Sequence, residues 1–244
     1  MLAKVAKYPG KKVSIEMNSG WYGFGFFRAA GLKTSVDVKG NTICDYNSKT
    51  NKYKGADVAT SMITIARHPA FLSADNPAVE TGVAKGVIVA CISGTWNAEK
   101  ISKAWGANYE ATKLPTFKCA GNDLQMWSPA GSKVFCVNAK SKNVKWSSKL
   151  ADFLTNEKCQ ITMAKEKGIG PSNLKAAESD VVKSNKALKA VAMQQQWSEV
   201  QVVGNNYWEP TRIFGETCAK GNKDKINPQV LVDKMVKAIT APVK

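Results

Sequence analysis

A short buried strand that ends in a polar turn constrains this fold more than any other feature. Residues 86–92 form an apolar run, typical of a strand buried on both faces of a parallel sheet. A turn at 93–95 follows, and Trp96 and Asn97 then lead into a predicted helix over 97–105, which Asn97 or Thr95 can cap. The pattern places the Trp96 ring at the carboxyl end of a parallel strand, the edge where open α/β sheets bind ligands.

The rest of the chain alternates strands with helices at first and then continues as helix after helix. A further short strand is predicted at 134–137, and the helical segment after it carries the apolar stripe Leu150, Phe153 and Leu154. The other predicted helices cover residues 54–67, 77–85, 173–197, 207–219 and 228–240. This order predicts an α/β fold with helical additions.

The net charge of +16 raises the question of nucleic-acid binding, but its distribution argues against that partner. Lysines are dispersed along the chain and only three residues are arginines, the side chain favoured for base contacts. We therefore expect a solvated lysine-rich surface and no nucleic-acid partner, while a basic face for anionic surfaces stays open. No apolar stretch reaches the ~20 residues of a membrane helix. Neither a transmembrane segment nor a signal peptide is expected.

Residues typical of catalysis or metal binding are scarce. His68 is the only histidine and precedes a proline at a predicted helix end. The six cysteines include no C-x-x-C pair, and we expect mostly buried free thiols. No nucleophile, phosphate-loop or zinc-protease motif is present. We predict a protein that is not an enzyme, without catalytic residues, metal ligands or a cofactor.

Aromatic residues next to glycine or polar neighbours are the remaining candidates for a binding site. They occur as the pairs Trp21–Tyr22 and Tyr207–Trp208, and as Trp96 alone. Trp and Tyr present a flat apolar face with a polar edge. A pyranose ring has a matching apolar C–H face and hydroxyl rim, so these rings suit a sugar. For Trp105, Trp146 and Trp197, which lie in helical patterns, we expect core packing instead.

Several motifs occur in the order found in one protein family. They are SGTWNA (93–98), NYEATKLPTF (108–117), VNAKSKN (137–143), ADFLTNEKCQ (151–160), GIGPSN (168–173) and NYW (206–208). The chain resembles the carboxyl-terminal portion of a family 1 extracellular solute-binding protein, the maltose/maltodextrin-binding type of carbohydrate ABC transporter. The resemblance implies a periplasmic-binding-protein-like fold, in which two α/β lobes hold a sugar between them.

The resemblance also implies a division of the chain and a set of ligand-binding residues. Residues 1–131 and 173–244 would form the C-terminal lobe with helical additions, and 132–172 a partial N-terminal lobe of one strand plus helices. The sugar-stacking rings implied by the matching positions are Tyr22, Trp96 and Trp208, with Trp21 and Arg212 beside them.

The implied function is non-catalytic binding of maltose or a malto-oligosaccharide, as the substrate-binding component of an ABC importer. Its partners would be the sugar and the permease subunits. Full-length relatives would be lipoproteins outside the cytoplasmic membrane. Because those relatives are longer, we expect a truncated or split form that binds sugar weakly alone. The alternative is a structural fragment that pairs with a missing N-lobe chain through the exposed stripe of Leu150, Phe153 and Leu154.

Overall fold

The computed structural model describes residues 1–242 and divides into two compact units. Unit 1 comprises Met1–Ile92, Leu114–Ala130 and the chain from Gln196 onward, and unit 2 comprises Ser93–Lys113 and Gly131–Gln195. Residues 93–113 and 173–195, predicted with the C-terminal lobe, thus group with 131–172. The last two residues of the predicted range 173–244 lie outside the described residues. The assignment of lobes stays a prediction.

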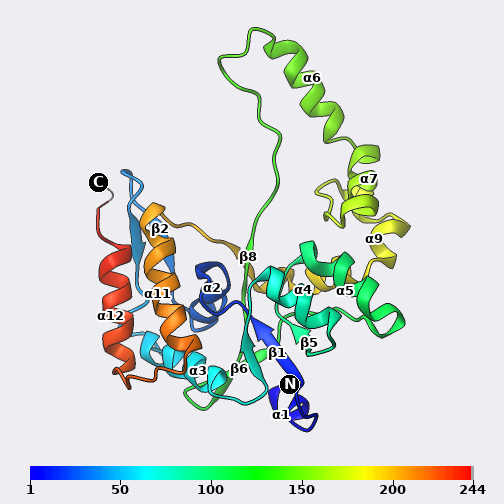
Figure 1. Ribbon diagram of the computed structural model, residues 1–244. Helices are drawn as coiled ribbons and strands as arrows, with labels where there is room; N and C mark the ends of the chain where they lie inside the picture. The colour runs from blue at the N-terminus through cyan, green and yellow to red at the C-terminus, as the bar shows by residue number, and fades with distance from the viewer. Residues whose placement is uncertain (243–244) are drawn as a thin grey trace. The chain divides into compact units, whose positions relative to one another are not determined.

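Unit 1 is built on a small parallel sheet and a layer of helices (Figure 1). Its elements are α1 (Leu2–Val5), β1 (Lys12–Ile15), α2 (Gly20–Ala29), β2 (Thr34–Val36), β3 (Thr42–Cys44), α3 (Gly55–Ala66), β4 (Phe71–Ser73), α4 (Asn76–Ala84), β5 (Ile88–Cys91), β6 (Thr116–Cys119), β7 (Asn122–Gln125), β8 (Ser128–Ala130), β9 (Ser198–Val200), α11 (Trp208–Ala219) and α12 (Pro228–Ile239). A short 3-10 turn at Gln195–Trp197 precedes β9, and another at Asn205–Tyr207 precedes α11.

The parallel sheet has the strand order β4–β1–β5, with Val13 opposite Phe71 and Lys12 opposite Ile88. The predicted strand at 86–92 is confirmed as β5. It pairs only with β1 among the described residues, and only Ile88 of its four residues is fully buried. The expectation of burial on both faces was therefore wrong, since Val89, Ala90 and Cys91 are only partly buried.

The core of unit 1 lies where α2, α3, α11 and α12 pack together (Figure 1). The rings of Phe27 and Tyr46 stack at a centroid distance of 4.1 Å, and Phe26 meets Phe117 edge-on at 4.9 Å. Burial raises the pKa of the Cys218 thiol, which lies in this core, to about 12. The helices predicted over 54–67 and 228–240 are confirmed as α3 and α12, since their apolar residues face this core.

Unit 2 is mostly helical. Its elements are a 3-10 turn (Thr95–Asn97), α5 (Ala98–Trp105), a second 3-10 turn (Gly106–Asn108), α6 (Val144–Leu154), α7 (Glu157–Lys167), α8 (Leu174–Ala177), α9 (Asp180–Ser184) and α10 (Lys186–Gln194). The start of α10 is tied to the end of the first segment, because Lys186 Nζ donates to Tyr109 O (2.7 Å) and pairs with Glu110. This link joins 93–113 to 131–195 in one unit.

The strand predicted at 134–137 is absent. Residues 131–138 have no regular structure, and no strand of the described residues pairs with them (Figure 1). A strand needs a neighbour to satisfy its backbone N–H and C=O groups. Val134, Phe135 and Cys136 are exposed here instead of filling a core.

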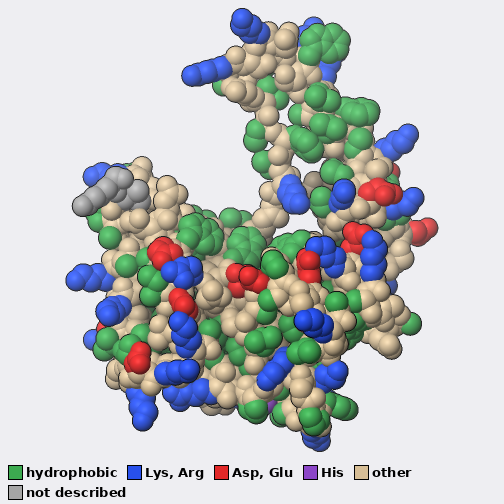
Figure 2. All heavy atoms as spheres, viewed as in Figure 1, with side chains coloured by type: hydrophobic (Ala, Val, Ile, Leu, Met, Phe, Trp, Pro, Cys, Tyr) green, Lys and Arg blue, Asp and Glu red, His purple; other side chains and the backbone are tan. Residues whose placement is uncertain are grey.

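The predicted exposure of the α6 stripe is confirmed for Leu150 and Phe153, and α6 has no buried residue. Figure 2 shows hydrophobic side chains at the surface over this helix. Trp146 on the same helix is 68% exposed, so its predicted core packing was wrong. The amphipathic pattern gave the helix correctly, but helical periodicity alone does not show whether a core covers the apolar face.

One buried side chain organises the turn of the GIGPSN motif in unit 2. The Gln160 carbonyl oxygen accepts from the backbone N–H groups of Ser172 (2.8 Å) and Asn173 (2.9 Å). Its amide nitrogen donates to Thr155 O, and the residue is buried. Asn173 in turn caps α8 by accepting from Ala176 N.

We predict that Gln160→Ala loosens this turn, because two backbone donors then lose their acceptor. Leaving buried donors unsatisfied costs about 1–3 kcal/mol. Hydrogen exchange of the Ser172 and Asn173 amides should speed up accordingly. Glu166→Ala, an exposed change on the same helix, is the matched control. Unchanged protection at 172–173 in Gln160→Ala would contradict the assignment.

Candidate functional site

Two helices of unit 1 begin in direct contact. Helix α2 starts at Gly20, after the end of β1, and α11 starts at Trp208. A Cβ at position 20 would collide with the side chains of Thr211 and Tyr207. The Tyr207 hydroxyl also donates to Gly20 O (3.1 Å). Glycine at position 20 is therefore what allows the two helix starts to meet.

Trp21 directly follows Gly20, and Trp208 directly follows Tyr207. Trp21 is half-buried and packs against the core, whereas Trp208 is 46% exposed. Trp208 meets the buried Tyr207 ring edge-on at 5.3 Å. Burial raises the pKa of Tyr207 to about 12, so its hydroxyl remains a neutral hydrogen-bond donor at neutral pH. The two indoles thus lie on neighbouring helix starts of the same unit.

Tyr22, the first of the predicted stacking rings, is only 9% exposed and belongs to the core cluster. Successive residues of a helix point in different directions around its axis, so the two residues of a Trp–Tyr pair can differ in burial. In α2 the inward residue is Tyr22 and the partly exposed one is Trp21. The sequence indicated the aromatic pair, but it did not show which of the two rings faces the core.

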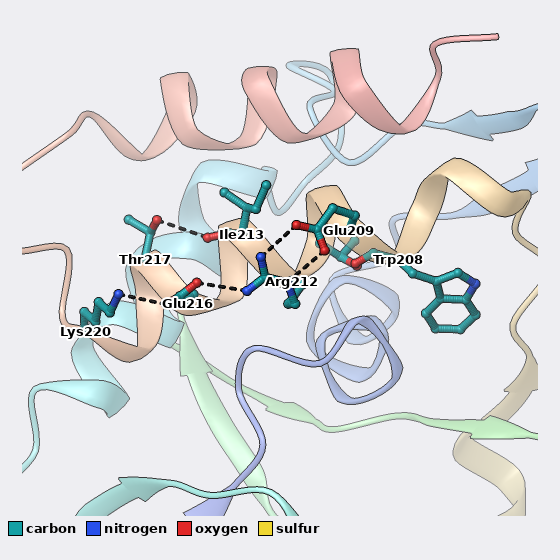
Figure 3. A network of polar contacts seen from close by, with 8 residues as sticks. Trp208, Glu209, Arg212, Ile213, Glu216, Thr217 and Lys220 are labelled. Carbon is teal, nitrogen blue, oxygen red and sulfur yellow. Dashed lines mark hydrogen bonds and ion pairs between the residues drawn. The ribbon is translucent and has the colours of Figure 1, made fainter. Parts of the chain in front are cut away.

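Arg212 lies on the exposed face of α11 within a row of ion pairs (Figure 3). Its guanidinium pairs with Glu209 (2.7 Å) and Glu216 (3.1 Å), and Glu216 also pairs with Lys220 (2.8 Å). The hydrogen bond from Arg212 lowers the pKa of Glu209, and that from Lys220 lowers the pKa of Glu216. Figure 3 shows the Trp208 indole pointing away from this row.

Trp96 belongs to unit 2, in the turn that follows β5. Its side chain is 52% exposed and its ring lies against Gly94, where a Cβ would collide with it. Asn97 Nδ2 donates to Ser93 Oγ (2.8 Å) and fastens the turn. Asn97 is the first residue before α5, but its side chain does not make the predicted capping bond.

Sequence reasoning missed a shallow groove at the carboxyl end of β4 in unit 1. It has a volume of about 540 Å³, and its lining includes Asn18, Asp75 and Lys220. Nearby Glu16, which follows β1, has a raised pKa because of burial and then the charge of Asp75. The signal in the sequence that could have indicated this groove is the polar residues that directly follow parallel strands.

Among residues 1–242, no three His, Cys, Asp or Glu side chains gather where they could hold a metal ion. No helix in that part of the chain combines the length and apolar character needed to cross a membrane.

Solved structures share this fold. A structure determined with acarbose matches with a TM-score of 0.82 at 26% identity, covering 94% of this chain and 62% of that one. The maltodextrin-binding protein of L. casei BL23, without ligand, matches with a TM-score of 0.78 at 22% identity, covering 95% and 62%. The maltose-binding periplasmic protein of Listeria monocytogenes, in complex with maltose, matches with a TM-score of 0.73 at 22% identity, covering 96% and 61%. The predicted periplasmic-binding-protein-like α/β fold is therefore confirmed.

Sequence comparison gives the family. The galactooligosaccharide-binding protein of Bacillus subtilis (strain 168) is 32% identical over 169 residues, which are 68% of this chain and 38% of that protein. The chain thus spans well under half the length of this curated relative. Residues 1–190 match the profile of the bacterial extracellular solute-binding proteins, as the resemblance predicted. This chain belongs to the bacterial extracellular solute-binding protein family.

Proposed function

We propose that this chain binds an oligosaccharide without catalysis, as part of the substrate-binding component of an ABC importer that works outside the cytoplasmic membrane. The observation that carries the proposal is the pair of indoles, Trp21 and Trp208, on the helix starts that meet at Gly20. Relatives named for galactooligosaccharide and maltodextrin binding support a sugar as the ligand. Its protein partners would be permease subunits.

The stacking surface on unit 1 differs from the one first predicted. Trp208 and Trp21 offer exposed indole surface, and the burial of Tyr22 leaves that ring little surface for a ligand. Trp96, which belongs to unit 2, remains a proposed stacking ring. Arg212 donates to two carboxylates of its own helix, so it orients these groups more readily than it clamps a sugar hydroxyl.

Malto-oligosaccharides and galacto-oligosaccharides are the two sugar classes to distinguish. Stacking on an indole requires only an apolar sugar face, which both classes present. Hydrogen bonds to the hydroxyl groups decide between such ligands. We propose a malto-oligosaccharide, because solved structures that share this fold are named for maltodextrin binding. We expect weak binding, because the chain spans 62% of the structures it resembles and a partial site leaves hydroxyl groups unpaired.

Calorimetry with maltotriose and with a galacto-oligosaccharide tests the proposal. Trp208→Ala and Trp21→Ala should each weaken binding by about tenfold or more, as expected for truncation of an aromatic anchor. Trp146→Ala is the matched control, since that indole is exposed in unit 2 and is assigned no ligand. No heat with either sugar would overturn sugar binding by this chain. Equal affinities in all three variants would overturn the stacking assignment alone.

We further predict that Gly20→Ala weakens sugar binding while Gly23→Ala does not. A Cβ at position 20 meets Tyr207 and Thr211 and forces the two helix starts apart, whereas a Cβ at position 23 meets nothing within 4 Å. Both glycines lie among the first four residues of α2, so each substitution adds one Cβ at the start of the same helix. Titration of both variants with the sugar bound by the wild type decides the matter. An equal effect of the two substitutions would mean that the contact does not position the indoles.

A second candidate function is supported by the exposed face of α6. Leu150 and Phe153, which is 61% exposed, form an apolar stripe of the kind that marks interaction sites. On this alternative, the chain is a structural fragment that pairs with a separate N-lobe chain and binds no sugar alone.

Size-exclusion chromatography of the purified chain discriminates between the two candidates. If α6 is an interaction face, the chain should self-associate, and Leu150→Lys with Phe153→Lys should restore the monomer. Lys145→Glu, an exposed change on the same helix, is a control for charge alone. A wild-type chain that elutes as a monomer and melts cooperatively would argue against the interaction role.

A further inference from the structure

A single arginine at the end of α2 binds both a tryptophan and a carboxylate of unit 1. The guanidinium carbon of Arg28 lies 4.2 Å from the centre of the Trp127 ring. Arg28 Nε and Nη2 both lie 2.6 Å from Glu199 Oε2. The Arg28 side chain is only 16% exposed, against 43% for Glu199. Partial burial and stacking make this pair stronger than an ordinary surface ion pair.

The chain leaves unit 1 twice and returns twice, and the residues that Arg28 binds adjoin the second exit and the second return, which we call the two passages. Trp127 precedes β8, and the chain passes to unit 2 after Ala130. Glu199 lies within β9, just after the return at Gln196. The two strands pair in parallel, and the Ser128 and Ser198 hydroxyl groups are 2.7 Å apart. Arg28 thus contacts both passages at once.

Further contacts fasten the same segments along α2, which lies beside β8 (Figure 1). Trp127 N donates to Gly25 O (3.2 Å), and a Cβ at Gly25 would collide with Trp127 O. Gln201 Nε2, just beyond β9, donates to Gly20 O (3.0 Å). Positions 21, 25 and 28 share one stripe of a helix, so Trp21 lies on the side of α2 that carries these contacts.

We propose that Arg28 is a positioning residue, which fixes both passages against the helix that carries Trp21. The inference rests on the proposed function insofar as it concerns sugar binding. Lysine cannot replace Arg28 in this role. Only the planar guanidinium stacks on an indole while two of its nitrogens bind one carboxylate. Removing this contact leaves β8 and β9 held by their own short pairing and by the hydrogen bonds of Trp127 N and Gln201 Nε2 to α2. The orientation of Trp21 toward a ligand then varies.

Hydrogen exchange and calorimetry on the full chain test the proposal, with Arg28→Lys as the main variant. Exchange of backbone amides in 126–130 and 198–201 should speed up by about tenfold, while amides of α12 keep their protection. Sugar affinity should fall several-fold. Glu199→Gln should act in the same direction. Arg67→Lys is the matched control, because Arg67 donates to Gly221 O in the same unit, away from both passages.

The outcomes separate the two proposals. Equal exchange at 126–130 and 198–201 in Arg28→Lys and Arg67→Lys would overturn the positioning role, whether or not sugar binds. Faster exchange with unchanged sugar affinity would also overturn it, leaving a purely structural contact. A wild-type chain that binds no sugar would overturn the proposed function, and the exchange result would then decide alone whether Arg28 holds the passages.

Discussion

The close approach of α2 to its neighbours is the constraint on which unit 1 depends. Gly20 admits the side chains of Tyr207 and Thr211, and Gly25 admits the backbone of Trp127. Glycine inside a helix costs about 1 kcal/mol relative to alanine. Here that cost is offset, because the start of α11 and the strand β8 can both lie directly on the helix. Gly20 and Gly25 are therefore packing requirements of this helix.

This constraint also explains why the candidate site consists of aromatic residues. At Gly20 and Gly25 the helix packs directly against its neighbours. The large side chains of the helix therefore lie beside these two contacts. Trp21 lies beside the contact at Gly20, and Trp208 lies at the matching place on α11. Their positions follow from backbone contacts in a well-packed unit, as a preorganised ligand surface requires. The charged row at Arg212 lies further along α11 and is satisfied within its own helix.

The sequence predicted helices well where an apolar stripe meets a core, as in α3 and α12, and it predicted the parallel strand β5. It predicted the Trp–Tyr pair of α2 but not which ring turns inward, because that depends on the phase of a helix whose first residue was unknown. The contacts of Arg28 were not foreseen either, since Trp127 and Glu199 lie about 100 and 171 residues away along the chain. The alternation and spacing used for prediction report only local structure.

The two features of unit 2 that differ most from an ordinary core have one physical origin. Residues 134–137 are apolar but form no strand, and the helix after them exposes Trp146, Leu150 and Phe153. A strand requires neighbouring backbone groups, and an amphipathic helix requires an apolar surface. A sheet with one free edge and one free apolar face would satisfy both requirements at once, because consecutive strand and helix of an α/β fold pack on the same sheet. Within the described residues neither requirement is met, since no strand pairs with 134–137 and α6 has no buried residue.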